Sequence, residues 1–365
     1  MPEKLSKPVI ALGGDLKCQP VYAAGDTAEV LPEIGDLASP DNQDALEDLV
    51  DRYEPELVVC DKHPGYFSTT LAERLAAERG LGLVKVQHHR AHVAAVAMEH
   101  GLFHEPIVGL AFDGTGYGDD AVAWGGEFFS GSVASGLARR AHMAPLPLPG
   151  GDVAVRAPWR IALATLIERG ADDETINAWL ESRGVQLRDV ELFKTGLARK
   201  LAVGRSTSVG RWFDAVAALL GVRTEVEFEA QGAIELQQLA EANAYDVQSG
   251  DWPYAISEEE PRVVDFPAFV DIASRPAGDA PRLAYAFHVA CAAAAAETAK
   301  RLADETGAKH VLVSGGVFFN RLLDGLLAER VGAHGLAYTK PIQLMPGDTA
   351  IALGQVGLVL AGTET

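Results

Sequence analysis

Three histidines fall within five residues of VQHHRAHVAAVAMEHG, the segment from Val86 to Gly101. The small apolar residues that follow them have helical spacing, so we expect a helix here. On a helix, His88 and His92 are four residues apart and project from one face, whereas His89 points elsewhere. Two imidazoles on one face can share a metal ion, but other elements must supply further ligands. The segment alone leaves a second interpretation open, which is a helix N-terminal turn with polar His side chains.

Two carboxylates in other segments are candidates for such ligands. Asp113 ends an apolar strand in AFDGTGYGDD, and a carboxylate in that position faces the cleft of an α/β domain. The glycines that follow it, Gly114 and Gly116, would let a phosphate approach the backbone, although Asp-Gly is also a common turn. Asp348 in MPGDTAIALGQ stands in a loop just before an expected helix, where it is either an N-cap or a ligand.

A third segment, VLVSGGVFFN, has the outline of a nucleotide-binding turn. An apolar strand leads into Ser314-Gly315-Gly316, and a helix bearing Asn320 follows. The first N–H groups of a helix lack intrahelical partners and can bind an anionic ligand. The segment is neither a GxxxxGK[ST] loop nor a GxGxxG fingerprint, so the motif alone does not identify the nucleotide.

The elements that must position these residues alternate between strands and helices. Residues 7–101 predict three short strands followed by helix, strand, helix, strand and helix. The strand-turn-strand-turn-strand rhythm starts again at PIVGLAFDGTGYGDDAVAWGGEFFSGSV, which hints at two related lobes. Residues 145–252 are expected to be mainly helical. RLAYAFHVACAAAAAETAKRLADETG predicts a long Ala-rich helix, whose small side chains allow close packing on a sheet. The whole pattern predicts an α/β architecture with mixed or parallel sheets.

Composition and charge exclude several classes of protein. The 365 residues carry a formal net charge of −20, which argues against a general binder of nucleic acid or anionic membranes. The three cysteines lie far apart and form no CxxC pair, which excludes a sequence-local Cys zinc site. No long apolar N-terminal region and no uninterrupted apolar run near about eighteen residues is present. We therefore expect a cytoplasmic protein without nucleic-acid or membrane partners.

Taken together, the motifs resemble those of a known family, the carbamoyltransferase region of the hydrogenase maturation factor HypF. That region is related to tRNA threonylcarbamoyladenosine synthesis proteins and antibiotic O-carbamoyltransferases. The matching motifs occur in the order HHxxH, apolar-DGTGYGDD, WGGEF, LPGGD, VSGGVFxN and PGDxxIALGQ. Further matches include GGDLK, IGDL, HPGYFST, APWRIAL and GRWFDAVAALLG, so the resemblance spans nearly the whole chain.

The resemblance implies a fold, a metal site and a nucleotide site. The fold would be the two-lobed α/β fold of actin, sugar kinases and chaperone ATPases, with a central nucleotide cleft. The lobes would span residues 1–103 and 104–365, the second with a helical insertion at about 145–300, and the final helix could pack back toward the first. Iron or zinc would be bound by His88, His92, Asp113 and Asp348. Adenine nucleotide would lie against Gly114, Thr115, Gly116, Gly125, Gly126, Gly315, Gly316 and Asn320.

The implied reaction is carbamoyl transfer from carbamoyl adenylate to the C-terminal cysteine thiol of HypE, which supplies the cyanide ligands of [NiFe]-hydrogenases. The metal would polarise the carbamoyl or phosphate oxygen while AMP leaves. Lys17 and His63, which stand in matching motifs, are candidates for charge neutralisation and proton transfer. Each has a plainer interpretation, since Lys17 could be solvated and His63 could order the His-Pro-Gly turn.

Departures from the family pattern keep other functions open. The chain is expected to lack the acylphosphatase, zinc-finger and adenylate-forming domains of full-length HypF, so the adenylate could come from a separate protein. Leu31-Pro32-Glu33 replaces a usual Ser-Gln-His, Cys18 replaces an Asn, and Phe319 replaces a Gln. One alternative is O-carbamoylation of a small molecule. Another is a nucleotide-binding partner or scaffold without catalysis.

Overall fold

The first lobe is built on a five-stranded sheet. In the computed structural model, which describes residues 1–120, 122–183, 185, 187–199, 203–242, 246–247 and 249–363, its strand order is β3-β2-β1-β4-β5. β1 pairs antiparallel with β2 and parallel with β4. The strands are β1 (Val9–Ala11), β2 (Val21–Ala24), β3 (Thr27–Val30), β4 (Leu57–Asp61) and β5 (Gly82–Val86). The helices are α1 (Pro40–Val50), α2 (Phe67–Arg79) and α3 (His88–Glu99).

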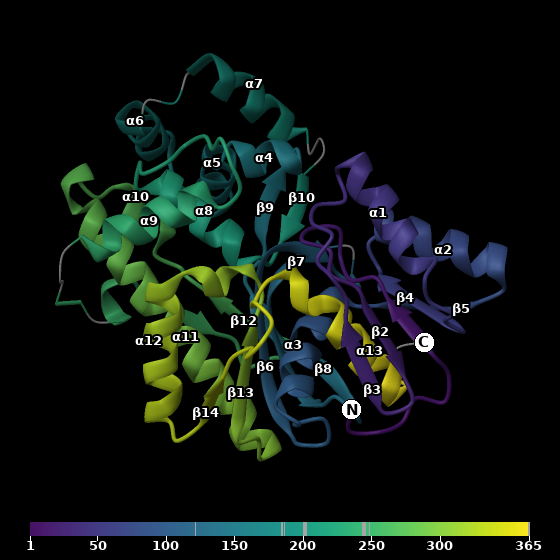
Figure 1. Cartoon of the computed structure of the whole chain (residues 1–365). Helices are drawn as coiled ribbons and strands as arrows, with labels where there is room; N and C mark the ends of the chain where they lie inside the picture. Colours follow the sequence, from purple (N-terminus) through teal and green to yellow (C-terminus); the bar gives the residue numbers. More distant parts are fainter. Residues whose placement is uncertain are drawn as a thin grey trace.

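The second lobe repeats this topology. Within its larger sheet, the consecutive strands β8-β7-β6-β13-β14 have the order and pairing directions of β3-β2-β1-β4-β5. These strands are β6 (Ile107–Tyr117), β7 (Ala123–Ser132), β8 (Gly136–Met143), β13 (His310–Ser314) and β14 (Ala337–Thr339). The duplicated order, visible as two sheets in Figure 1, confirms the two-lobed fold that the sequence predicts.

A mainly helical segment lies between β8 and β13 and covers one side of the second lobe (Figure 1). Its core is rich in aromatic side chains, including the buried Trp179, Trp212 and Trp252. The helices are α4 (Asp152–Arg156), α5 (Trp159–Glu168), α6 (Asp173–Arg183), α7 (Leu187–Ala198), α8 (Val209–Leu219), α9 (Gln231–Glu241), α10 (Phe269–Ala273) and α11 (Ala280–Thr306). The strands are β9 (Leu146–Pro149), β10 (Val203–Ser206), β11 (Ala255–Ile256) and β12 (Arg262–Asp265), and short 3₁₀ turns cover Ser249–Asp251 and Ala277–Asp279.

Helix α3 forms part of a layer between the two sheets. Successive side chains of a strand point to opposite faces, so each sheet can pack helices on both sides. In β1, Val9 and Ala11 belong to the core shared with α3, whereas Ile10 packs with α1 and α2. In β6, Ile107 and Ala111 contribute to that same shared core. The helix with the paired histidines is therefore held by both lobes.

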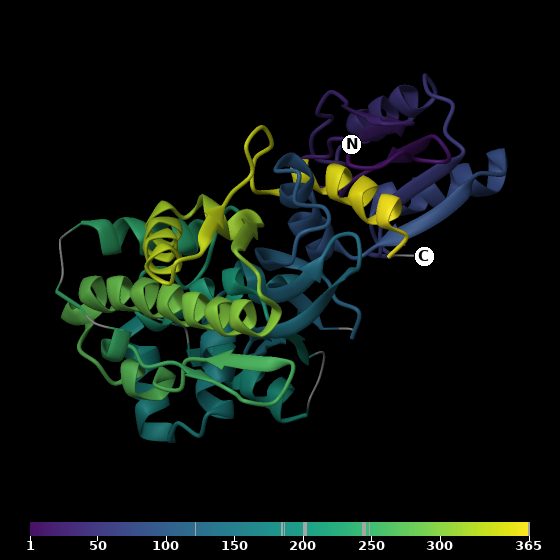
Figure 2. The same cartoon turned by 90° about the horizontal axis from the view of Figure 1, so that it is seen from below.

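The chain ends with a helix that packs beside α3. After α12 (Arg321–Ala333), a loop and the 3₁₀ turn Asp348–Ala350 lead into α13 (Ile351–Ala361), which contacts α3 and the first sheet. Figure 2 shows α13 in yellow lying along the purple first lobe. Gln355 accepts a hydrogen bond from the Gly13 N–H at 2.9 Å, so this helix also fixes the β1 loop. Among the described helices, none is long and apolar enough to span a membrane.

Candidate metal and nucleotide site

His88, His92, Asp113 and Asp348 meet where α3, β6 and the start of α13 converge. One ligand atom from each residue lies within 4.8 Å of the other three. His88 Nε2 lies 3.4 Å from Asp113 Oδ2, and His92 Nε2 lies 3.7 Å from Asp348 Oδ1. Ligand atoms about 2.1 Å from one ion at tetrahedral angles would lie ~3.4 Å apart. The geometry therefore matches a site that a small change in side-chain position would close around one divalent ion.

In His88 and His92, the Nδ1 atom faces away from the cluster and is hydrogen-bonded, which fixes the tautomer of each ring. His88 Nδ1 lies 2.7 Å from Asp61 Oδ2, a carboxylate that accepts the ring proton. His92 Nδ1 lies 3.1 Å from Ser314 Oγ. Because the Ser314 hydroxyl donates to the Pro346 carbonyl at 3.0 Å, its oxygen accepts the proton of His92 Nδ1. In the neutral form of each ring, Nε2 then presents its lone pair to the cluster, and both Nε2 atoms are buried without a hydrogen-bond partner among the described residues.

His89 has the opposite tautomer. Gln87 N-caps α3, since its side-chain oxygen accepts from the N–H groups of His89 and Arg90. The Gln87 amide nitrogen is thereby left 3.3 Å from His89 Nδ1, and an amide N–H can only donate. His89 Nδ1 must accept, so Nε2 carries the proton and is unsuited to bind a metal. Burial and the neighbouring His88 hold the pKa of His89 well below its usual range.

Backbone groups orient the Asp113 carboxylate. Asp113 Oδ1 accepts hydrogen bonds from Gly114 N–H at 2.8 Å and Gly316 N–H at 3.0 Å, which leaves Oδ2 for the histidines. Asp348 is not the N-cap of its turn, a position held by Gly347, and its Oδ1 lies 4.0 Å from His88 Nε2. β6 and the turn before α13 thus each contribute a carboxylate oxygen to the cluster.

Burial and neighbouring charges strongly perturb the pKa values of His88, Asp113 and Asp348. Burial opposes protonation of His88, but Asp61, Asp113 and Asp348 outweigh it and raise the pKa of His88 well above its usual range. Burial also opposes ionisation of Asp113, yet the adjacent His88 and His92 side chains hold its pKa well below the usual range. Burial and the Asp113 charge raise the pKa of Asp348 to about 6. A divalent cation would relieve this concentration of acidic charge.

A cavity of about 540 Å³ opens from the carboxylate side of the cluster. Asp113 and Asp348 line it, so the cluster forms one end of the cavity. Both lobes contribute to its wall, the first through the β1 loop and the second through α8, α9 and the turn after β13. The remaining lining residues are Leu16, Lys17, Asp36, Gly114, Thr115, Gly210, Arg211, Phe213, Asp214, Glu229, Ala230, Ala233, Ile234, Gln237, Gly316, Val317, Phe319, Asn320 and Gly347.

Two family models together match most of the chain. One, described as "HypF Kae1-like domain", matches residues 4–99. The other, described as "Carbamoyltransferase, Kae1-like Domain, second subdomain", matches residues 109–355. The chain belongs to the HypF carbamoyltransferase family. This confirms the resemblance found in the sequence.

Curated relatives and solved structures agree with this assignment. Carbamoyltransferase HypF2 of Cupriavidus necator is 38% identical over 96% of this chain, which spans 46% of that relative. The "Carbamoyltransferase HypF homolog" of the same organism is 39% identical over 95% of this chain and 90% of its own length. The crystal structure of full-length HypF in a phosphate- and nucleotide-bound form matches 98% of this chain and 47% of its own, with 30% identity and a TM-score of 0.86. The chain thus spans about half the length of most curated HypF relatives that it matches.

The residues expected to contact the nucleotide fall into two groups. Gly114, Thr115, Gly316 and Asn320 line the cavity. Gly116, Gly125, Gly126 and Gly315 do not. A Cβ at Gly116 would collide with the rings of His88 and His89, and one at Gly125 with the Asp113 carbonyl. A Cβ at Gly126 would overlap Thr207, and one at Gly315 would overlap Phe112. These four positions need glycine because protein atoms approach closely.

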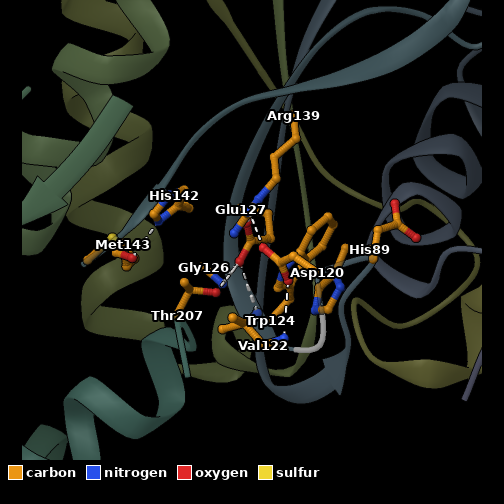
Figure 3. A network of polar contacts seen from close by, with 12 residues as sticks. His89, Asp120, Val122, Trp124, Gly126, Glu127, Arg139, His142, Met143 and Thr207 are labelled. Carbon is orange, nitrogen blue, oxygen red and sulfur yellow. Dashed lines mark hydrogen bonds and ion pairs between the residues drawn. The ribbon is translucent and has the colours of Figure 1, made fainter. Parts of the chain in front are cut away.

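Glu127 of the WGGEF motif stabilises the β7–β8 hairpin beside Asp113, a role that the sequence did not indicate. Its buried carboxylate accepts from Arg139 Nε at 2.5 Å, from the Thr207 hydroxyl, and from the Gly126 N–H at 3.3 Å (Figure 3). On the same hairpin, the Arg139 guanidinium lies 4.0 Å from the Trp124 ring, and Asp120 accepts from both of these side chains. The network braces β7 against β8 and β10.

Lys17 and His63 occupy different surroundings. Lys17 lines the cavity, with Nζ 5.2 Å from the centre of the ring of Phe319, another lining residue. His63 lies outside the lining, where its ring stacks on Tyr66 with centroids 4.1 Å apart. Its Nδ1 accepts a hydrogen bond from Gly65 N–H at 3.1 Å, which orders the His-Pro-Gly turn.

Tyr66 is a further residue that the sequence analysis missed. A Cβ at Gly14 would lie 3.8 Å from its ring, 3.6 Å from Asp348 Oδ2 and 3.8 Å from the His88 ring, so these three groups surround one point. Burial and the charges of Asp61, Asp348, Asp113 and Asp15 raise the pKa of Tyr66, which stays protonated. The N-terminus of its helix is fixed by Asp15, which accepts from the Phe67 and Ser68 N–H groups.

Proposed function

We propose that this chain is a metal- and nucleotide-dependent carbamoyltransferase of [NiFe]-hydrogenase maturation. It would move the carbamoyl group of carbamoyl adenylate to the C-terminal Cys thiol of a HypE-like protein in the cytoplasm. One observation carries the proposal: Asp113 and Asp348 belong both to the His/Asp cluster and to the cavity wall. A nucleotide in this cavity would therefore place its phosphate end beside the ion.

The residues fit a divalent ion, which we expect to be iron or zinc. Two neutral imidazoles with inward lone pairs and two carboxylates form a donor set that both metals accept. Asp61 and Ser314 hold the imidazoles in the required tautomer, as outer partners do in established metal sites. Bound there, the ion would act as a Lewis acid on a carbamoyl or phosphate oxygen.

In the transfer step, the acceptor thiolate attacks the carbamoyl carbon. A C–S bond forms, the bond from carbon to the phosphate oxygen breaks, and AMP leaves with the electron pair, while the thiol proton passes to solvent. The product is a thiocarbamate. Lys17 is suited to balance the phosphate charge, because it lines the same cavity as Asp113 and Asp348.

The test supplies synthetic carbamoyl adenylate and a partner protein that ends in Cys, and mass spectrometry follows the carbamoyl increment on the partner. We expect transfer with metal-loaded protein and none with His88→Ala or His92→Ala. The matched control, His89→Ala, removes a buried imidazole from the same helix turn but no proposed ligand. Absence of transfer by protein with an intact metal site would contradict the proposed acceptor reaction.

The same experiment separates the alternative functions. Carbamoylation of a small hydroxyl compound, with no modification of the thiol partner, would favour an O-carbamoyltransferase. Protein that binds neither metal nor nucleotide would favour a scaffold without catalysis.

A further inference from the structure

His288 is a buried histidine that no motif singled out, in the first half of the long helix α11. Its Nδ1 lies 2.7 Å from the Ala284 carbonyl oxygen, and its Nε2 lies 3.0 Å from the Asn320 side-chain nitrogen. A carbonyl oxygen can only accept, so the ring proton resides on Nδ1 and Nε2 is an acceptor. Burial lowers the pKa of His288 to about 4, which agrees with a neutral ring.

This tautomer fixes the orientation of the Asn320 amide. Because His288 Nε2 accepts, the Asn320 group facing it must be the NH₂. The Asn320 oxygen then faces the Leu323 N–H at 3.0 Å and caps α12. Two independent contacts, one to a ring acceptor and one to a backbone donor, therefore require the same orientation of this amide.

Asn320 also lines the cavity. With one N–H committed to His288, the amide has a second N–H, and no other hydrogen bond from this nitrogen occurs within the described residues. The wall is shaped here by Phe213 as well, which lines the cavity and meets the His288 ring edge-on with centroids 5.0 Å apart. His288 thus lies directly behind two wall residues without lining the cavity itself.

We propose that His288 is a positioning residue for nucleotide binding, which fixes the Asn320 amide so that its second N–H donates to an acceptor atom of the nucleotide. The inference rests on the proposed nucleotide role of the cavity. Without the imidazole acceptor, the amide can rotate about its side-chain bonds, and the donor is no longer held for the ligand. Ordering that donor in advance reduces the entropic cost of binding.

A double-mutant cycle on AMP affinity tests the proposal, with isothermal titration calorimetry on metal-loaded protein. His288→Leu removes the acceptor, and we expect AMP affinity to fall about three- to tenfold, as for the loss of one hydrogen bond. His288→Gln keeps a carbonyl acceptor near the position of Nε2, so we expect it to restore most of the affinity. In an Asn320→Ser background, which retains a capping hydroxyl for α12, His288→Leu should cause no further loss.

The matched control is Thr298→Val on the same helix. Thr298 is also buried and also donates to the carbonyl four residues earlier, but its contact does not involve the cavity. We expect its AMP affinity to be unchanged. Equal AMP affinity of wild type and His288→Leu, or the same loss in both backgrounds, would overturn the positioning role alone. If the wild type bound no AMP, the nucleotide role of the cavity and this inference would both fall.

Discussion

His88 and His92 present lone pairs to the cluster, and His89 does not. In each case the hydrogen-bond partner of Nδ1 decides the tautomer. Asp61 and Ser314 accept ring protons on the Nδ1 side, whereas the Gln87 amide donates to Nδ1 of His89. Metal content measured by mass spectrometry should therefore fall to background in His88→Ala and His92→Ala. His89→Ala should retain nearly full metal content, and an empty site in that variant alone would show that the ligand pair is misassigned.

The partners of the imidazoles should also affect metal affinity. Asp61→Asn removes the negative charge beside His88 Nδ1, which weakens the histidine as a donor and loosens its orientation. We expect metal affinity, measured by competition with a chelator, to fall about ten- to a hundredfold. Thr69→Val is the control, because it removes a buried hydrogen bond to the Asp61 backbone carbonyl and leaves the carboxylate in place. A similar loss of affinity in both variants would point to general loosening of this loop.

At this scale, the sequence predicts local relations well and tertiary ones poorly. The spacing of His88 and His92 follows from helical geometry and needs no other part of the chain. The contact between His92 and Ser314 joins residues 222 positions apart, and no local pattern indicates it. Glycine-rich segments are ambiguous for a related reason. Gly125 and Gly315 leave room for neighbouring backbone atoms, whereas Gly114 and Gly316 line a cavity. The residue type alone does not distinguish the two roles.

Among the elements, the packing of α13 on α3 depends on small side chains. Gly354 faces Ala91 so closely that an added Cβ would overlap the Ala91 carbonyl oxygen, and a Cβ at Gly357 would lie 2.9 Å from the Met98 side chain. This contact joins the helix that carries His88 and His92 to the helix preceded by Asp348. The final helix therefore stabilises the fold and fixes one ligand relative to two others.

We expect Gly354→Ala to lower the free energy of unfolding by about 1–3 kcal/mol, because the two helices must separate. Metal affinity should fall in the same variant. Gly325→Ala provides the matched control in α12, where the added Cβ meets no atom within 4 Å. That control should stabilise the protein, by up to about 1 kcal/mol, because alanine favours the helix. Chemical denaturation and a chelator competition measure the two effects, and an unchanged Gly354→Ala protein would contradict the packing argument.

The contact between α3 and α13 is only partly evident in the sequence. The residue patterns of the two segments predict the helices α3 and α13 themselves. Their mutual contact follows from no local pattern, because it forms between segments about 260 residues apart, on opposite sides of the helical insertion; only the family resemblance implied that the final helix could pack toward the first lobe.

For the whole molecule, the repeated strand rhythm predicts two lobes of one topology, and the structure confirms this. The strand rhythm does not predict which surfaces enclose the cavity. The walls contributed by α8 and α9 come from the insertion, which has no counterpart in the first lobe. The cavity is therefore a property of the assembled lobes, and its acidic end is set by Asp113 from one strand and Asp348 from the last turn.

This arrangement predicts that metal and nucleotide binding are coupled. Without an ion, the phosphate of AMP would approach two carboxylates, and like charges at such distances repel. With a divalent ion, the same end of the cavity attracts the phosphate. We expect removal of the metal by a chelator to weaken AMP binding at least about tenfold. By linkage, AMP should raise metal affinity by the same factor.

Adenosine is the control ligand, because it can occupy the cavity but carries no phosphate. Its affinity should be nearly independent of the metal, so the ratio of the AMP and adenosine affinities isolates the interaction between phosphate and ion. His92→Ala should reproduce the effect of the chelator on AMP and leave adenosine binding intact. If chelation weakened AMP and adenosine binding equally, the ion would be acting on the shape of the cavity, and the phosphate would lie away from Asp113 and Asp348.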